Sequence, residues 1–285
     1  MAEEILVTGA TGNVGRELVR VLAEAGADVR ACVRDTSRDA GLHDGVDLVA
    51  FDFADPETFT AALTGIDRVF FMRPPHMADA SAFEPFVTAM RDAGVSQVVF
   101  LSLMGVERNP VVPHHAIEKL LRGSGLGWTF LRPGFYMQNL LTTHLRDIRE
   151  RDEVFVPAGN GRTSFIDVAD IAACAAVLLT EPGHTGQAYT VTGPRALTYG
   201  EVAGILTRVT GRTITYTRPS GRAFARHMAE LGFDREMITV MRGIYLVAKL
   251  GMAGGVTDDL ERLLGRPART FEQFAADNAA VFSAG

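Results

Sequence analysis

Cysteine is scarce in this sequence. Only Cys32 and Cys174 are present, far apart and in apolar surroundings, with no CxxC spacing. A disulfide framework is therefore excluded, and we expect two buried thiols. The seven histidines form no HExxH motif or similar ligand spacing. No metal site is predicted.

Positively charged residues are also fewer than negatively charged ones. Lys and Arg number 28 against 34 Asp and Glu, which gives a net charge of -6. A protein that binds nucleic acid needs clustered cations, so we expect no nucleic-acid partner. The longest apolar runs fall far short of the roughly 20 residues that span a bilayer. The acidic start, Met1-Ala2-Glu3-Glu4, does not resemble a signal peptide, so we expect a cytoplasmic protein without a membrane partner.

Strand and helix patterns alternate through the first half of the chain. Apolar residues at helical spacing, such as Val14, Leu18 and Val21, follow the first β-rich run. This alternation indicates βαβ units, and hence a doubly wound, Rossmann-type α/β fold with helices on both faces of a parallel sheet. The predicted strands are 5–8, 29–33, 47–51, 68–72, 97–101 and 128–131.

The alternation of strand and helix patterns becomes less regular after about residue 150. We predict two domains: 1–150, which holds the sheet, and 151–285, a smaller and mainly helical lobe whose elements are partly interleaved with the first domain. The expected strands of the lobe are 189–192 and 214–216, and its expected helices are 167–179, 199–210, 220–250, 258–264 and 271–281.

A glycine-rich turn links the first strand to the first helix, in the stretch TGATGNVG. Gly9 permits a tight turn, Gly12 lets backbone N–H groups approach a pyrophosphate, and Gly15 allows close packing of the helix. The N–H groups at the start of the helix then hold the anion. In this strand–turn–helix context the motif predicts a dinucleotide site. Its residues are Gly9, Thr11, Gly12, Asn13, Val14 and Gly15.

The end of the second strand decides which dinucleotide binds. An NAD site usually has a carboxylate there for the ribose 2′-OH. Here Arg34 comes first, and its guanidinium suits a 2′-phosphate. We therefore predict that NADP(H) is preferred over NAD(H), while Asp35 remains the alternative in an NAD site. The topology also places Asp52 and Phe53 near the adenine.

With these residues in hand, the chain resembles the NmrA-like family of atypical short-chain dehydrogenases/reductases. The likeness covers nearly the whole chain and includes TGATGNVG, VRDTSR, HHAIEK, SGLGWTFLRPGFYMQN, FIDVADI and TGPRALTYGEVAGIL. Members of the family include quinone reductases, phenylpropanoid reductases, ergot-type iminium reductases and regulators that only sense the cofactor. The resemblance implies that Arg34 meets the 2′-phosphate, that Lys119 holds the nicotinamide ribose and that Pro133 joins the cofactor site.

One position departs from the family pattern. Conventional members carry Tyr-x-x-x-Lys, in which the tyrosine gives a proton to a carbonyl oxygen, and here His115 takes the tyrosine's place before Lys119. A neutral imidazole can donate through one N–H, so His115 is a candidate proton donor. The alternative is that it only caps, packs or meets solvent. We interpret His114 and Glu118, four residues apart, as a structural hydrogen bond.

Other candidates follow the ends of strands. Ser102 lies where the fold's catalytic serine usually is, although a plain turn serine is the alternative. Arg73 should border the nicotinamide ribose. Phe135 and Tyr136 should line the acceptor pocket, because open α/β sheets bind ligands past the carboxyl ends of their strands. Two further candidate pocket walls are Met228 and Tyr245, for which packing in the core is the alternative.

The leading hypothesis is an NADPH-dependent reductase of a small, largely apolar and activated acceptor, such as a quinone, an iminium ion or a conjugated carbonyl. The rival is a non-catalytic sensor of NADP(H). The glycines, Arg34 and Lys119 serve both hypotheses equally, and the Met- and Phe-rich lobe favours the enzyme. The expected partner is a small-molecule substrate, and either a monomer or a homodimer is consistent with the sequence.

Overall fold

The computed structural model describes residues 4–38 and 40–283. The chain divides into two compact units. Unit 1 holds the residues up to Pro133 together with Val168–Val191 and Asp259–Arg266, and unit 2 holds Gly134–Asp167, Thr192–Asp258 and the residues from Pro267 onward. The sequence analysis places the boundary near residue 150, with elements partly interleaved between the domains; the chain leaves unit 1 at Pro133 and returns to it twice.

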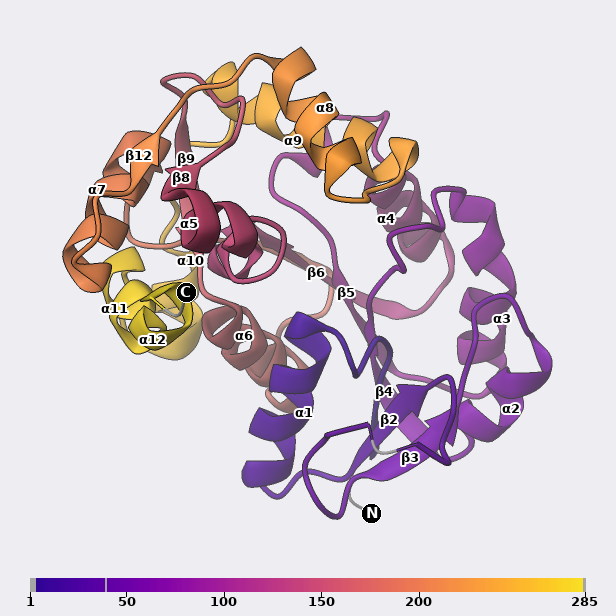
Figure 1. Ribbon diagram of the computed structural model, residues 1–285. Helices are drawn as coiled ribbons and strands as arrows, with labels where there is room; N and C mark the ends of the chain where they lie inside the picture. The colour runs from indigo at the N-terminus through magenta and orange to yellow at the C-terminus, as the bar shows by residue number, and fades with distance from the viewer. Residues whose placement is uncertain (1–3, 39, 284–285) are drawn as a thin grey trace. The chain divides into compact units, whose positions relative to one another are not determined.

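Unit 1 is built on a seven-stranded parallel sheet (Figure 1). Its order is β10-β6-β5-β4-β1-β2-β3, so the direction of winding changes between β1 and β4. At such a switch point a doubly wound sheet opens a crevice for ligands beyond its carboxyl edge. The predicted Rossmann-type fold is confirmed. The strands are β1 Glu4–Val7, β2 Val29–Val33, β3 Asp47–Ala50, β4 Ile66–Phe71, β5 Gln97–Leu101, β6 Gly127–Pro133 and β10 Gln187–Val191.

Helices cover both faces of this sheet. On one face α2 (Glu57–Leu63), α3 (Glu84–Asp92) and α4 (Pro113–Gly123) bury phenylalanine, isoleucine and leucine side chains against the strands. On the other face α1 (Asn13–Glu24) packs on α6 (Val168–Thr180), and α10 (Asp259–Leu264) contacts α6. Short 3-10 helices precede α3 and α4, namely η1 (Ala80–Phe83) and η2 (Val106–Arg108).

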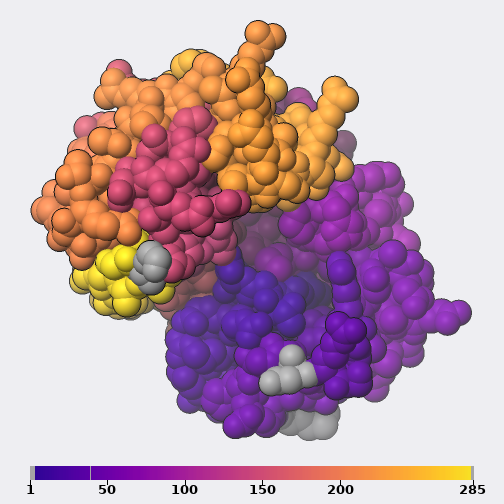
Figure 2. Space-filling view, in the orientation of Figure 1, coloured from indigo at the N-terminus to yellow at the C-terminus, as the bar shows by residue number. Residues whose placement is uncertain are grey.

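Unit 2 is richer in helices. Its strands form two small sheets: β9 (Arg162–Ile166) lies between β7 (Phe135–Tyr136) and β11 (Ala196–Thr198), and β8 (Glu153–Val154) pairs with β12 (Thr215–Tyr216). The α8–α9 segment lies at the surface of this unit (orange in Figure 2). The helices are η3 Met137–Leu140, α5 Leu145–Arg151, α7 Tyr199–Thr210, α8 Gly221–Glu230, α9 Arg235–Lys249, α11 Phe271–Asp277 and α12 Ala279–Ser283.

Two composition-based expectations can be compared with the structure. Cys32 and Cys174 are both buried free thiols, as predicted, and burial raises the pKa of each thiol above its ordinary value. Within residues 4–38 and 40–283, no helix combines the length and the apolar character needed to cross a bilayer.

Candidate active site

The glycine turn between β1 and α1 presents unpaired backbone donors. Gly12 is the N-cap of α1, yet no side chain caps this helix and no acidic residue occupies its first turn. The Gly12 N–H donates to the Gly9 carbonyl at 2.9 Å, which closes the turn, and Gly9 adopts a φ of 63° that favours glycine. The first N–H groups of α1 therefore remain available to an anion.

The space over this turn is shaped by the absence of side chains. A Cβ on Gly12 would lie 3.2 Å from Met72 Cε and 3.3 Å from the Gly9 oxygen. A Cβ on Gly15 would collide with the Gly9 carbonyl, so Gly15 lets α1 approach the turn itself. The residues present thus form the cradle that a pyrophosphate requires, with backbone N–H groups at its floor.

The turn is tied to the neighbouring strand by Thr8. The Met72 N–H donates to Thr8 Oγ1 at 2.8 Å, and that hydroxyl donates to the Phe70 carbonyl at 3.1 Å. Thr8 follows β1 and Met72 follows β4, so this link spans the switch point of the sheet. The Met72 methyl group consequently rests against Gly9 and Gly12.

Two residues at the end of β2 differ in what they already bind. Asp35 accepts hydrogen bonds from Ser37 N at 3.0 Å and Ser37 Oγ at 2.6 Å, and it pairs with Arg38 at 3.0 Å. Hydrogen bonds from Ser37 lower the pKa of the Asp35 carboxyl. Arg34 is exposed, and its guanidinium has no hydrogen bond or ion pair with any described residue. The Asp35 carboxylate is therefore bonded within its own turn, whereas the Arg34 guanidinium has no partner among the described residues.

The two residues predicted to lie near the adenine differ in how far their side chains are exposed. Asp52 is exposed, and its carboxylate accepts from Ala54 N at 2.9 Å. Phe53 is only 8% exposed, and its ring packs against those of Phe51, Phe71 and Phe86. The Phe53 side chain therefore belongs to the core of unit 1, and only its backbone can face a cofactor.

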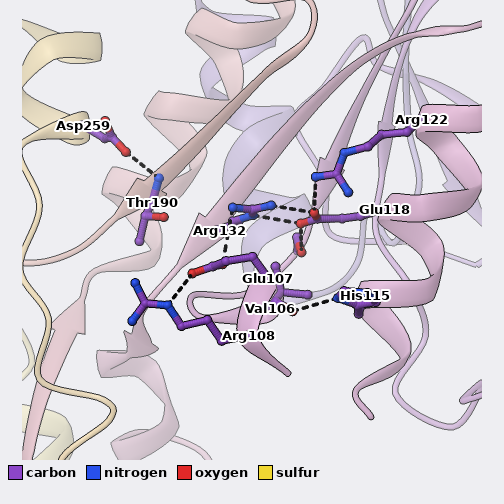
Figure 3. A network of polar contacts seen from close by, with 10 residues as sticks. Val106, Glu107, Arg108, His115, Glu118, Arg122, Arg132, Thr190 and Asp259 are labelled. Atoms are coloured by element: carbon purple, nitrogen blue, oxygen red, sulfur yellow. Dashed lines mark hydrogen bonds and ion pairs between the residues drawn. The ribbon is translucent and has the colours of Figure 1, made fainter. Parts of the chain in front are cut away.

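Helix α4 carries the position that departs from the family pattern. The Nδ1 atom of His115 lies 3.0 Å from the Val106 carbonyl oxygen (Figure 3). A carbonyl oxygen can only accept, so Nδ1 carries the proton and Nε2 of the neutral ring has a lone pair. The single N–H of neutral His115 is thus bonded to Val106, and its role as a proton donor stays a prediction. One turn later Lys119 is exposed and has no partner among the described residues.

A buried carboxylate forms the centre of a polar network on the same helix (Figure 3). Glu118 is 2% exposed and accepts from Ser102 Oγ at 2.7 Å, from Arg132 at 2.6 and 2.9 Å and from Arg122 at 2.9 Å. Burial by itself raises the pKa of Glu118, but the hydrogen bonds and charges of these partners lower it below its ordinary value. The carboxylate is therefore ionised and saturated.

This network bears on two interpretations made from the sequence. Ser102 is buried and donates its proton to Glu118, which favours the structural alternative for this serine. Glu118 has no hydrogen bond with His114 in the described chain, because Ser102 and the two arginines already occupy its oxygens. His114 Nδ1 is buried without a partner, and burial, followed by the charge of Arg73, lowers the pKa of the ring to about 4.

The expected pocket residues of unit 2 divide between its surface and its core. Phe135 and Tyr136 form β7 and are partly exposed, and desolvation raises the pKa of the Tyr136 hydroxyl. Met228 has no exposed surface, and Tyr245 is buried with its hydroxyl hydrogen-bonded to His144. Core packing, the alternative given above, is what the structure assigns to Met228 and Tyr245.

Arg132 and Arg122 were not singled out from the sequence. One signal was available: Arg132 lies inside the strand-forming run WTFLRP, and a charge in a buried strand requires a partner. A second signal was the i, i+4 spacing of Glu118 and Arg122. Nothing in the sequence joins Arg132 to Glu118, since 14 positions and a change of element separate them.

Comparison with known proteins finds that this chain is similar to reductases. A model of the NmrA-like family matches residues 1–271. An NAD(P)H azoreductase of Xenophilus azovorans is 39% identical, over 98% of this chain and 99% of its own length. The (4-alkanoyl-5-oxo-2,5-dihydrofuran-3-yl)methyl phosphate reductase of Streptomyces griseus is 34% identical, over 98% and 99%. The crystal structure of an NADPH-dependent quinone oxidoreductase from Escherichia coli, complexed with NADPH, superposes with a TM-score of 0.87 at 26% identity, over 96% and 99% of the two chains.

Proposed function

Because the chain belongs to the NmrA-like family, we propose that it is an NADPH-dependent reductase that transfers a hydride to a small, activated acceptor. Its similarity to oxidoreductases over nearly its whole length supports NAD(P)H-dependent reduction. The class of acceptor is our inference: a quinone, an iminium ion or a conjugated carbonyl. The similarity to the Xenophilus azovorans azoreductase adds azo compounds to these candidates.

The observation that carries this proposal is the set of unsatisfied donors around the switch point. The start of α1 has no capping side chain, and Arg34 has no partner, whereas the neighbouring carboxylate of Asp35 is engaged. Backbone N–H groups suit a pyrophosphate, and a free guanidinium suits the additional 2′-phosphate of NADPH. The residues that we expect to bind the cofactor are Gly9, Thr11, Gly12, Asn13, Val14, Gly15, Arg34, Asp52, Arg73, Lys119 and Pro133, with the backbone of Phe53.

NADPH, when bound, supplies the hydride. The chain's own residues then orient the reactants and exclude water, and the Lys119 ammonium holds the ribose. Both proton donors considered from the sequence are already bonded within the described chain: the N–H of His115 to Val106, and the hydroxyl proton of Ser102 to Glu118.

Because the protons of His115 and Ser102 are already bonded, the choice of acceptor is limited. Reduction of a simple ketone creates a localised alkoxide, which needs a positioned donor. Reduction of a quinone creates a delocalised, weakly basic anion, and hydride addition neutralises an iminium ion. We therefore favour these activated acceptors over simple alcohol and ketone pairs. The Streptomyces griseus relative is itself named for a substrate in which a carbonyl group is joined to a ring with a double bond, and which also bears a phosphate ester.

A panel of acceptors tests the proposal. The purified protein is mixed with NADPH and with quinones, azo compounds, enones, cyclic imines and simple ketones, and the loss of NADPH absorbance is followed. We expect turnover of at least one activated class and none of the simple ketones. Tight NADPH binding without turnover of any acceptor would contradict the proposal and favour the rival hypothesis, a sensor of NADP(H).

A further inference from the structure

The exposed apolar side chains of the described chain gather on one segment of unit 2. Eight large hydrophobic residues are exposed, and six of them fall between positions 240 and 256, in α9 and the loop that follows it. Apolar residues scattered singly over a surface are ordinary, whereas a cluster of them marks an interaction site. We call five of the six the α9 patch: Val240, Ile244, Leu246, Leu250 and Met252.

The α9 patch is continuous along one side of the helix. Val240 and Ile244 are four residues apart and therefore neighbours on the helix surface, as are Leu246 and Leu250. At the helical spacing of 100° per residue, Gly243 and Val247 fall between these two pairs. Gly243 has no side chain, and Val247 is itself apolar and partly exposed. No polar side chain therefore divides the patch along this part of α9.

The structure holds this patch outward. On the opposite side of α9, Ile238, Met241, Tyr245 and Ala248 are buried in the core of unit 2. After the helix, the Met252 N–H donates to the Val247 carbonyl at 3.1 Å. The Ala253 carbonyl accepts from Ser164 N at 2.9 Å and from Ser164 Oγ at 3.1 Å, which ties the loop to β9. The exposure of the patch is thus a property of the fold, not of a frayed helix end.

The charges around the patch are all positive. Between residues 237 and 257 the only charged side chains are Arg242 and Lys249. Both are exposed, and neither has a hydrogen bond or ion pair with a described residue. Their spacing of seven residues places them on the same side of α9, next to the patch. From 218 to 256 the chain has six Lys and Arg against three Asp and Glu, although the chain as a whole is acidic.

We propose that the α9 patch binds the surface of an anionic lipid bilayer. The apolar side chains enter the boundary between headgroups and acyl chains, while Arg242 and Lys249 meet lipid phosphates. The expectation of no membrane partner rested on the lack of a span and of a leader segment, and a contact at the membrane surface needs neither. The proposal goes beyond the reductase, since an apolar acceptor dissolves in the same bilayer, and it is tested without any acceptor.

The composition of the patch favours lipid over a second copy or another protein. A symmetric contact between two copies would bring the Arg242 and Lys249 side chains of both together, with no acidic residue between 237 and 257 to pair with them. Protein interfaces are enriched in Tyr and Trp and carry many hydrogen bonds. Here the exposed neutral side chains that can form hydrogen bonds are Thr239 and Thr257 alone. A bilayer requires no such partners.

Sedimentation of the full chain with vesicles tests this surface. One set of vesicles is pure phosphatidylcholine, and the other contains equal parts of phosphatidylglycerol and phosphatidylcholine. We expect the anionic vesicles to bind at least about tenfold more tightly, and Arg242→Gln with Lys249→Gln to remove this preference. The triple variant Ile244→Gln, Leu246→Gln, Leu250→Gln should bind anionic vesicles at least about tenfold more weakly, because burial of one such side chain is worth that much.

Matched variants control for charge and for apolar surface. Arg91→Gln with Arg208→Gln removes the same charge from exposed arginines of α3 and α7, and Val281→Gln removes an exposed valine of α12; both should bind like the parent. Leu250→Trp reports insertion. With anionic vesicles its fluorescence, after subtraction of the parent's single Trp128, should move to shorter wavelength.

Several results would overturn the proposal. They are no binding of the parent to anionic vesicles, binding that survives the triple variant, and binding that depends on the cations alone with no wavelength shift in Leu250→Trp. A dimer that the triple variant dissociates, without vesicle binding, would assign the patch to a second copy. If the triple variant does not fold, Leu250→Gln and Leu250→Trp decide the question. Failure of the acceptor panel would overturn the reductase and leave this binding unchanged.

Discussion

The glycine turn and the inner side of α4 lie in the same unit and treat their polar groups in opposite ways. At the turn, the donors at the start of α1 are left without a capping side chain, and Arg34 is left without a counter-ion. On α4, four hydrogen bonds from three residues saturate the carboxylate of Glu118. Both features are polar, but only the first has donors left for a ligand.

The comparison teaches how to separate binding groups from structural ones. Satisfied polar groups hold elements together: Glu118 and Arg132 join α4 to β6, and Ser102 links β5 to the same helix. Unsatisfied groups that are fixed in place indicate a missing ligand. Ser102 is such a structural group, whereas we expect the unpaired Arg34 and Lys119 to meet the cofactor.

Gly12→Val tests the binding side of this comparison and should have the largest effect. The new side chain would occupy the cradle between Met72 Cε and the Gly9 oxygen, where the pyrophosphate meets the backbone. We expect NADPH affinity to fall by more than about a thousandfold, more than one lost charged hydrogen bond explains. Calorimetry measures the affinity and thermal melting checks the fold. Gly123→Val, where a Cβ meets nothing within 4 Å, is the control. Normal NADPH binding in an intact Gly12→Val protein would mean that the phosphate site is elsewhere.

Glu118→Leu tests the structural side of the comparison, the saturated network on α4. The substitution leaves Arg132 buried without its carboxylate, and removal of one partner of a buried pair typically costs about 3–5 kcal/mol of unfolding free energy. Urea denaturation measures this loss. Glu150→Leu, which removes the exposed pair with Arg146, should cost less than about 1 kcal/mol. Similar small losses in both variants would show that the Glu118 network does not stabilise unit 1.

His115 and Lys119 of α4 should separate alignment from proton transfer. We expect His115→Phe to slow single-turnover hydride transfer by less than about a hundredfold, the low end of general acid catalysis, and Lys119→Ala to slow it more, because the ribose loses its anchor. His115→Asn, whose amide can still donate to the Val106 carbonyl, should resemble His115→Phe. A loss near ten-thousandfold in His115→Phe, at unchanged NADPH affinity, would make His115 the essential acid and return simple ketones as candidates.

Arg34→Ala should have the smallest of these effects. We expect the parent protein to bind NADPH at least about tenfold more tightly than NADH, and the variant to lose most of this preference, since a charge-assisted contact contributes roughly 1.5–3 kcal/mol. Fluorescence titration with both cofactors measures the ratio. Arg38→Ala is the matched control, because Arg38 is exposed and already paired with Asp35. Equal affinities in the parent protein would transfer the role to Asp35.

The sequence predicted the features that depend on neighbouring residues. The turn from Gly9 to Gly15 and the alternating elements of unit 1 are local patterns, and both are present in the structure. The strand predicted at 189–192 was found, but its place at the edge of the parallel sheet was not predicted, because pairing with β6 is set by residues far away.

The features that were missed depend on contacts between distant residues. The bond from His115 to Val106 and the burial of the Phe53 ring each require tertiary neighbours that no local pattern specifies. β12 corresponds to the predicted strand 214–216, but two other strands of unit 2 escaped detection for a related reason. β7 and β8 contain two residues each, which is too short for a period-2 pattern to be recognised.

Rapid mixing of the NADPH-bound protein with an activated acceptor tests the central claim most directly. We predict that NADPH absorbance is lost in a single turnover as the reduced acceptor appears at the same rate, and that deuterium at the transferred position of NADPH slows both signals. The Gly12→Val protein should show neither signal. Saturating NADPH binding with no acceptor-dependent oxidation, for any quinone, azo, iminium or conjugated carbonyl compound, would contradict the assignment as a reductase.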